Sequence, residues 1–271
     1  MPEATAQAMI EKALEEGVRF FDTAVLYGNG ISESRYGKHL TPKYRDVSFI
    51  MTKTLARDGD SARRDLDASL KRLNVESIDL WQLHALDTPE DVERRIQNGV
   101  LDAFQTAQES GKVKHLGFTG HTSYKAHLKM LQEAEKRGLK FAAAQMPINP
   151  ADPHFDSFFI NALPKCVNAG VGVLAMKTVA DGRFWGGNAG WKRTNVNVQP
   201  AIPNALSLAQ VFAYVWSLPV SCLISGMETV AHVTENAAMA RNQQTLNEEK
   251  RQQLVDAMAP YAGQDLEFYK N

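Results

Sequence analysis

The chain has 271 residues, of which 44% are hydrophobic and 23% are charged, as is typical of a folded globular protein and not of a disordered chain. Its formal net charge of -1 supplies no basic field for nucleic acid or anionic lipid. No apolar run approaches the roughly 20 residues that a membrane span needs. The first 17 residues predict a polar-faced helix and not a signal peptide. We therefore expect a cytoplasmic protein with no nucleic-acid or membrane partner, unless an upstream segment is missing.

The cysteines and histidines do not form a metal-binding pattern. Cys166 and Cys222 lie far apart and belong to no CxxC pair, which argues against a disulfide scaffold, a zinc site or an iron–sulfur cluster. His115, His121 and His127 fall in a predicted strand start, a loop and a helix, which rarely point at one place. We expect no bound metal.

In chain order, short apolar runs alternate with segments of helical period. The runs lie at residues 18–23, 47–53, 78–84, 114–119, 141–146, 171–177 and 220–225. Amphipathic segments between them include residues 60–73, 100–112, 123–138 and 205–218. Buried strands separated by helices predict an α/β fold with a parallel sheet. Before four of the strands stands a glycine that suits the left-handed end of a helix: Gly17, Gly111, Gly138 and Gly170.

The repeat of about 30–40 residues and the absence of a linker predict one domain over residues 1–271, a TIM-type (β/α)8 barrel. A closed barrel of this type needs eight strands, and seven apolar runs are present. Residues 247–271 predict a helix and then a polar tail, a poor substitute strand. We expect an N-terminally short barrel of seven strands, with a gap between the strands ending at Ser225 and Asp22. An added upstream apolar strand should raise the melting temperature and tighten cofactor binding.

Four polar side chains follow the ends of three successive predicted strands. Asp22, Lys53 and His84 stand at or beside the strand ends, and Tyr27 follows Asp22 in the same loop. Strand ends of a parallel barrel open at one mouth, so these side chains should converge there. A lysine ammonium beside a tyrosine lowers the tyrosine pKa, and the phenol could then donate a proton to a carbonyl oxygen that the histidine fixes.

Each of these residues also has a purely structural interpretation. Asp22 could close a turn, Lys53 could be a solvated strand end, and His84 could be a satisfied core histidine. Their ordered occurrence with Tyr27 favours the proton-transfer site.

The segment GVRFFDTAVLYGNGISESRYGKHL resembles the strand, loop and helix that open the active site of aldo-keto reductases, and the resemblance runs from about residue 3 to about residue 241. The motifs that carry it are DTA-x-x-YG, TK and QLH, which contain Asp22, Tyr27, Lys53 and His84. The resemblance implies NAD(P)H-dependent reduction of an aldehyde or ketone, or the reverse, with Tyr27 as proton donor. The sequence also resembles a bacterial subgroup of the family, some members of which carry an added ferredoxin tail. No cysteine follows Cys222 here, so we expect no such tail.

The same resemblance implies a site for NADPH or NADH. Thr119 and Gly120 stand where the family usually has a Ser-Asn pair for the carboxamide, and Gln145 matches a glutamine that binds the same group. Met176 replaces a tyrosine that many members stack on the nicotinamide. Lys177 could reach the pyrophosphate.

Residues 224–240 resemble the family's last strand and its adenosine-binding helix. This implies that the adenosine part of the cofactor is contacted by Gly226, His232, Glu235 and Asn236. No Lys or Arg occurs in residues 226–236, so we expect a weaker preference for NADPH than is usual in the family.

The sequence says less about which residues bind the substrate. His121 near the mouth and Trp185 in the long loop 181–204 could contact a small carbonyl substrate, as could Trp191, although the loop could equally pack on itself. Two alternatives to an active reductase stay open. One is a nucleotide-binding regulatory or redox-sensing subunit on the same fold, and the other is an inactive, N-terminally truncated fragment. The sequence indicates neither the substrate nor the oligomeric state.

Overall fold

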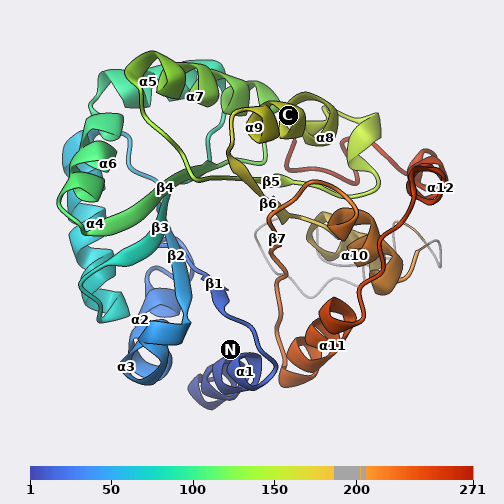
Figure 1. Cartoon of the computed structure of the whole chain (residues 1–271), viewed down its shortest axis with the longest axis horizontal. Helices are drawn as coiled ribbons and strands as arrows, with labels where there is room; N and C mark the ends of the chain where they lie inside the picture. The colour runs from blue at the N-terminus through green and yellow to red at the C-terminus, as the bar shows by residue number, and fades with distance from the viewer. Residues whose placement is uncertain (186–201, 203–205, 271) are drawn as a thin grey trace.

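The computed structural model describes residues 1–185, 202 and 206–270, and its centre is one parallel sheet. The strands are β1 (Phe20–Asp22), β2 (Phe49–Thr54), β3 (Ile78–Leu83), β4 (Val113–Thr119), β5 (Ala143–Pro147), β6 (Gly172–Met176) and β7 (Cys222–Leu223). All neighbours pair in parallel and in chain order, so the seven predicted strands are confirmed. The sheet curls into an open arc (Figure 1). Within the described residues β1 and β7 do not pair, which confirms the predicted gap.

Helices surround the outer face of the arc. The longer ones are α1 (Glu3–Glu15), α2 (Ile31–His39), α4 (Gly59–Leu73), α5 (Pro89–Gln97), α6 (Val100–Glu109), α7 (Tyr124–Arg137), α10 (Leu208–Trp216), α11 (Val230–Arg241) and α12 (Glu248–Met258). Short turns of helix are α3 (Thr41–Tyr44), α8 (Phe158–Asn161), α9 (Leu163–Asn168), η1 (Arg45–Val47), η2 (Asp152–His154) and η3 (Ala180–Trp185). None of the helices in the described part of the chain is long and apolar enough to cross a membrane.

Local sequence explains where these helices begin and end. The Asp58 carboxylate accepts a hydrogen bond from the Ser61 backbone N–H and so caps the start of α4. Gly138 adopts a φ of 64° directly after α7, a left-handed conformation that glycine adopts without a steric penalty. The other three glycines predicted to end helices also have positive φ.

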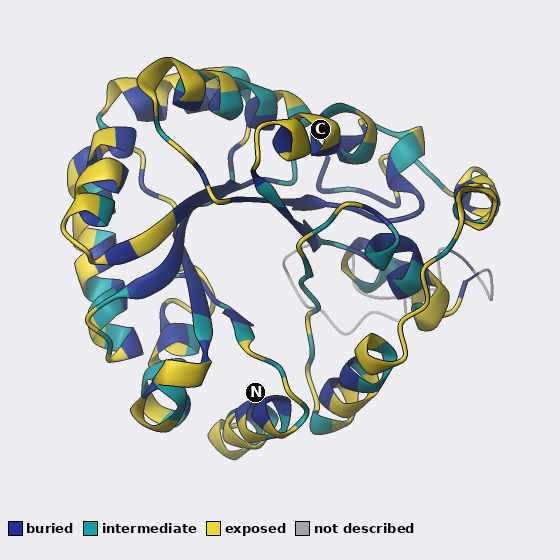
Figure 2. Cartoon of the chain, viewed as in Figure 1, coloured by how far each residue is buried: buried dark blue, intermediate teal, exposed yellow. Residues whose placement is uncertain are grey.

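Two apolar clusters pack against the sheet, one on each face, and a third lies among α10, α12 and the C-terminal tail. Between the sheet and the helices, Trp81 of β3 stacks on Phe104 of α6 with ring centroids 4.0 Å apart. The smaller inner layer contains Met51, Leu80 and Leu174. Figure 2 shows buried residues along the strands and on the helix faces that pack against them. Burial of this apolar surface, at about 25 cal/mol per Å², is the main force that holds the strand ends in place.

The gap in the sheet is flanked on the outside by α1 and α11, which lie side by side next to the open edges (Figure 1). An ion pair joins them, with 2.6 Å between Arg241 Nη1 and Glu16 Oε2. Helices α1 and α11 therefore meet even though β1 and β7, the strands next to them, do not pair.

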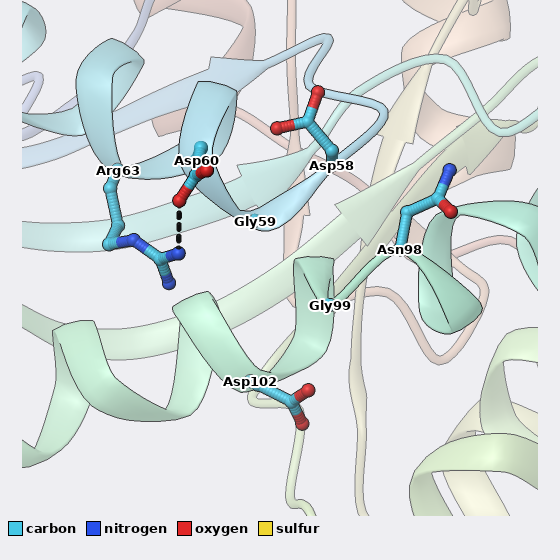
Figure 3. Close-up of a pocket in the computed structure, with 7 residues that line it drawn as sticks. All are labelled: Asp58, Gly59, Asp60, Arg63, Asn98, Gly99 and Asp102. Carbon is cyan, nitrogen blue, oxygen red and sulfur yellow. Dashed lines mark hydrogen bonds and ion pairs between the residues drawn. The ribbon is translucent and has the colours of Figure 1, made fainter.

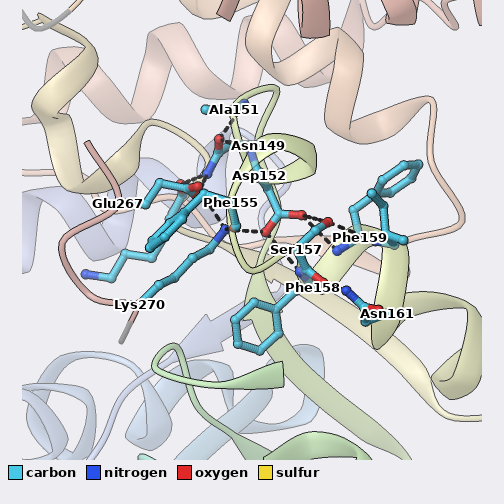
Figure 4. Close-up of polar contacts among 12 residues, drawn as sticks. Asn149, Ala151, Asp152, Phe155, Ser157, Phe158, Phe159, Asn161, Glu267 and Lys270 are labelled. Carbon is cyan, nitrogen blue, oxygen red and sulfur yellow. Dashed lines mark hydrogen bonds and ion pairs between the residues drawn. The ribbon is translucent and has the colours of Figure 1, made fainter. Parts of the chain in front are cut away.

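The C-terminal tail differs from the predicted polar tail. Leu266, Glu267, Tyr269 and Lys270 are all buried, because the chain folds back over the ends of β5 and β6 after α12. Lys270 Nζ lies 2.7 Å from Asp152 Oδ1 and 2.8 Å from Glu267 Oε2 (Figure 4). These buried charges are paired with one another, which is why a polar sequence can be internal.

Candidate active site

Asp22, Lys53 and Tyr27 meet at the end of the strands, as the strand-end rule predicts. Asp22 is the last residue of β1, and Lys53 precedes the last residue of β2. The Lys53 ammonium pairs with Asp22 Oδ1 and donates to the Thr23 carbonyl at 2.8 Å and to the Tyr27 hydroxyl at 3.3 Å. One lysine thus links the carboxylate and the phenol.

His84 follows β3 directly and lies beside Tyr27. The two ring centroids are 6.0 Å apart and the rings are nearly perpendicular, at 84°. The structure therefore brings together all four of the predicted proton-transfer residues.

The charge on Lys53 is held in place by its neighbours. The side chain is 1% exposed, and burial alone would lower its pKa. Asp22 and Tyr27 reverse this effect, so the pKa of Lys53 is raised and the ammonium stays charged.

The expectation that Lys53 would lower the Tyr27 pKa below its ordinary value was wrong in its net direction. Tyr27 is 38% exposed as a residue, yet the protein around its phenol desolvates it. This desolvation raises the Tyr27 pKa, and the nearby Lys53 charge opposes it only in part. Tyr27 is consequently a protonated acid at neutral pH.

His84 is neutral in this site. Burial first, and then the charges of Lys53, His121 and Arg95, lower the pKa of His84 to about 3. Its Nδ1 is buried and accepts or donates no hydrogen bond within the described part of the chain. A neutral imidazole can donate one N–H to a carbonyl oxygen.

Gln145 connects this cluster to the predicted nicotinamide site. Its amide nitrogen donates to Asp22 Oδ2 at 3.1 Å. Its amide oxygen is buried and has no hydrogen-bond partner among the residues described. A buried amide oxygen without a partner is a suitable acceptor for a carboxamide NH₂, so Gln145 fits the group that the resemblance implies.

The neighbouring strand end explains the Thr119–Gly120 departure from the usual Ser-Asn pair. Thr119 is buried, and its carbonyl accepts from the Leu86 N–H at 2.9 Å. A Cβ on Gly120 would lie 2.4 Å from the Leu86 carbonyl oxygen and 3.2 Å from His127. The backbone leaves no room there for an asparagine.

Met176 and Lys177 are at the end of β6. Met176 is half-buried, and Lys177 Nζ pairs with Asp181 Oδ1 at 2.7 Å. The same ammonium lies 5.5 Å from the centre of the Tyr269 ring. To contact a pyrophosphate, Lys177 would have to exchange Asp181 for the phosphate.

His121 and Tyr269 form a contact that the sequence did not predict. His121 Nδ1 is 3.2 Å from the Tyr269 carbonyl oxygen, and burial lowers the pKa of His121. The tail thus lies beside one of the two predicted substrate residues. The other, Trp185, is 40% exposed and donates from its indole N–H to the Leu206 carbonyl at 3.2 Å. Trp191 and most of loop 181–204 lie outside the described residues.

The predicted adenosine segment follows β7. The Asn236 amide donates to Ser225 Oγ at 2.8 Å, which joins the start of the segment to α11. His232 is exposed, and its Nδ1 accepts from the Glu228 N–H at 3.3 Å. Glu235 is exposed on the same helix, and Gly226 has no atom within 4 Å of where a Cβ would be.

A shallow cavity of about 250 Å³ lies apart from these residues, at the starts of α4 and α6 (Figure 3). Asp58 and Asp60 line it, together with Asp102 and Arg63. Asp58 serves as the cap of α4, and Asp60 pairs with Arg63 at 2.6 Å. In the described parts of the chain, no three His, Cys, Asp or Glu side chains are grouped to hold a metal ion.

Comparison with known proteins identifies the family of the chain. The profile described as the Aldo/keto reductase family matches residues 1–258. The chain is 32% identical over 207 residues to the uncharacterized oxidoreductase YrpG of Bacillus subtilis, covering 68% of this chain and 60% of YrpG. It thus spans about three fifths of the length of that relative. It is 29% identical over 256 residues to a 6-dehydroglucose reductase of Novosphingobium aromaticivorans, covering 86% of this chain and 80% of that one.

Solved structures show the same fold. The holo form of aldo-keto reductase AKR11C1 from Bacillus halodurans superimposes with a TM-score of 0.77 at 20% identity, covering 98% of this chain and 91% of that chain. A putative 2,5-diketo-D-gluconic acid reductase B gives a TM-score of 0.72 at 21% identity, covering 95% and 84%. The seven-stranded arc therefore corresponds to the barrel of these proteins.

Proposed function

The chain belongs to the aldo/keto reductase family, and on that basis we propose that it catalyses NAD(P)H-dependent reduction of an aldehyde or ketone to an alcohol, or the reverse. The observation that carries the proposal is the position of Lys53 Nζ, which contacts both Asp22 and the Tyr27 hydroxyl. An acid whose conjugate base lies against a buried cation can give up its proton at neutral pH.

In the proposed reaction Tyr27 donates its proton to the carbonyl oxygen of the substrate. The raised pKa of Tyr27 keeps the proton on the phenol until that oxygen becomes basic. As the phenolate forms, the Lys53 ammonium at 3.3 Å stabilises its charge, and Asp22 holds the ammonium in place. The bound nicotinamide supplies the hydride. Neutral His84, beside the Tyr27 ring, donates an N–H to the same carbonyl oxygen and orients it.

The proposed cofactor site extends from Gln145 and Thr119 to α11. The amide oxygen of Gln145, which has no partner among the described residues, would accept from the carboxamide, and residues 226–236 would hold the adenosine. Because the described part of that segment presents no Lys or Arg, we propose that both NADH and NADPH are accepted.

The substrate is proposed to be a small molecule with one reactive carbonyl. The relative from Novosphingobium is a 6-dehydroglucose reductase, so sugar-derived aldehydes belong among the compounds tested. His121 and Trp185 stay candidates for substrate contact.

The test is the consumption of reduced nicotinamide with a panel of aldehydes, ketones and dehydro-sugars, combined with a fluorescence titration of cofactor binding. Turnover of at least one carbonyl together with cofactor binding supports the reductase. Binding without turnover would replace it with a nucleotide-sensing subunit. Absence of both would indicate an inactive chain.

A further inference from the structure

Arg95 of α5 is an arginine in an unusual place. Its side chain is 1% exposed, although arginine is mostly found at protein surfaces. Its two terminal nitrogens donate to two successive backbone carbonyls, Nη1 to His84 at 2.9 Å and Nη2 to Ala85 at 3.0 Å. The guanidinium therefore binds the backbone of His84, a residue of the proposed active site.

The backbone at this point needs external support. Ala85 has a φ of 53°, in the left-handed region, which is unfavourable for a residue that has a Cβ. The turn directs the chain away from β3 immediately after His84, whose N–H still donates to the Thr54 carbonyl at 2.8 Å. The two carbonyls at the turn accept from Arg95, so the planar fork of the guanidinium fixes both peptide units.

Arg95 is itself held by a carboxylate that extends the contact to the neighbouring loop. Arg95 Nη2 lies 2.8 Å from Asp91 Oδ2, and the other oxygen of Asp91 pairs with Arg57. Arg57 follows β2, the strand that carries Lys53. The series of ion pairs Arg57–Asp91–Arg95 therefore connects the loop after β2 with the loop after β3.

We propose that Arg95 is a positioning residue for the proposed reaction, which acts by fixing the backbone of His84 so that its imidazole faces Tyr27. The kinetic part of this inference rests on the proposed function. The geometric part does not, because it concerns the conformation of His84 whether or not a substrate is turned over.

The charge of Arg95 supports the same role. The pKa of His84 is lowered by burial first, then by the charges of Lys53 and His121, and also by the charge of Arg95. Arg95 thus acts on His84 through a hydrogen bond to the His84 carbonyl, through a second one to the next carbonyl, that of Ala85, and through its charge.

The kinetic test compares Arg95→Met with Arg94→Met. Arg94 is the adjacent residue on α5, is 68% exposed, and comes only to 4.0 Å of Asp91, so it is a matched control. We expect kcat per cofactor-binding site to fall about 10- to 100-fold in Arg95→Met, the loss that misplacement by about 1 Å can cause, with the cofactor Kd unchanged. Arg94→Met should behave as the wild type. Arg95→Lys, which keeps the charge but cannot reach both carbonyls, should recover only part of kcat.

A double variant distinguishes positioning from a general loss of structure. If Arg95 acts through His84, then His84→Gln with Arg95→Met loses no more kcat than His84→Gln alone. Two losses that multiply in the double variant would overturn the proposal.

The third readout needs no substrate, so it separates failure of this inference from failure of the proposed function. In NMR spectra of protein with ¹⁵N-labelled histidine, we expect the His84 ring signals to shift in Arg95→Met and their pKa to rise from about 3, with no change in Arg94→Met. If Arg95→Met does not fold, Arg95→Lys and Arg57→Met carry the same measurements. Unchanged His84 signals would overturn the proposal, even in a protein that reduces carbonyls.

Discussion

The Gln145 amide nitrogen donates to Asp22 Oδ2 at 3.1 Å, across the mouth between β5 and β1. The same Asp22 carboxylate pairs with Lys53 through its other oxygen. One glutamine therefore touches the proton-transfer cluster with its nitrogen and leaves its oxygen available to a nicotinamide. In the proposed reaction this arrangement would link cofactor binding to the geometry of the acid.

Replacing Gln145 with leucine should weaken cofactor binding about fivefold to tenfold, because one hydrogen bond of about 1–1.4 kcal/mol is lost. A fluorescence titration measures it. Gln105→Leu is the control, since Gln105 is exposed on α6 and its side chain donates to Glu109 on the same helix. Unchanged binding in Gln145→Leu would show that the amide does not hold the carboxamide.

Gly120→Ala should lower the free energy of unfolding by about 1–3 kcal/mol, the usual cost of overpacking. The added Cβ would lie 2.4 Å from the Leu86 carbonyl oxygen, and backbone atoms there cannot move aside easily. Gly226→Ala is the matched control in the same proposed cofactor site, because nothing lies within 4 Å of its Cβ position. Urea unfolding of both variants makes the comparison. Equal stabilities would contradict the account of why this chain has glycine where asparagine is usual.

The strands were predictable because their signal is local. Each apolar run of the sequence corresponds to an observed strand, yet residues 220–225 gave only the two-residue β7. An edge strand has one neighbour, so regular pairing stops sooner than the apolar run does. The strand-end rule placed Asp22, Lys53 and His84 correctly because the ends of parallel strands share one side of the sheet.

What the sequence did not reveal depends on contacts between distant segments. Tyr269 lies next to His121 and Lys270 next to Asp152, with more than one hundred residues between the partners. No local pattern marks such a tail as buried, although Leu266, Phe268 and Tyr269 make it less polar than its charges suggest. The net direction of the Tyr27 pKa shift was missed for a similar reason, since desolvation is set by the whole surroundings of the hydroxyl.

The unfolding free energy should fall as pH decreases from 6.5 to 4, partly because of His127. Burial lowers the pKa of His127 to about 4, while an unfolded histidine titrates near 6.5. In this interval the unfolded chain takes up a proton that the folded protein excludes. By pH 4 this difference lowers the free energy of unfolding by about 3 kcal/mol. His127→Gln keeps an N–H for the Gln145 carbonyl but does not titrate. Chemical unfolding at several pH values should give a shallower decline for this variant, and parallel curves would refute the assignment.

The preference between NADPH and NADH should be small. The family resemblance implies that the exposed His232 stands where an arginine would usually hold the 2′-phosphate, and an imidazole replaces a guanidinium poorly. Titration of both cofactors tests this expectation. A preference for NADPH of about a hundredfold would be inconsistent with it. His232→Arg should then shift the preference toward NADPH.

The central claim is that the Tyr27 hydroxyl donates the proton, and single-turnover oxidation of bound reduced nicotinamide by a carbonyl substrate tests it most directly. Tyr27→Phe removes the hydroxyl that lies 3.3 Å from Lys53 Nζ and keeps the ring beside His84. Tyr261→Phe is the control, because Tyr261 is also 38% exposed but lies after α12, outside the proposed site. We predict that Tyr27→Phe slows the reaction by about two to four orders of magnitude with cofactor binding nearly unchanged, while Tyr261→Phe reacts as the wild type does. A wild-type rate in Tyr27→Phe would contradict the mechanism.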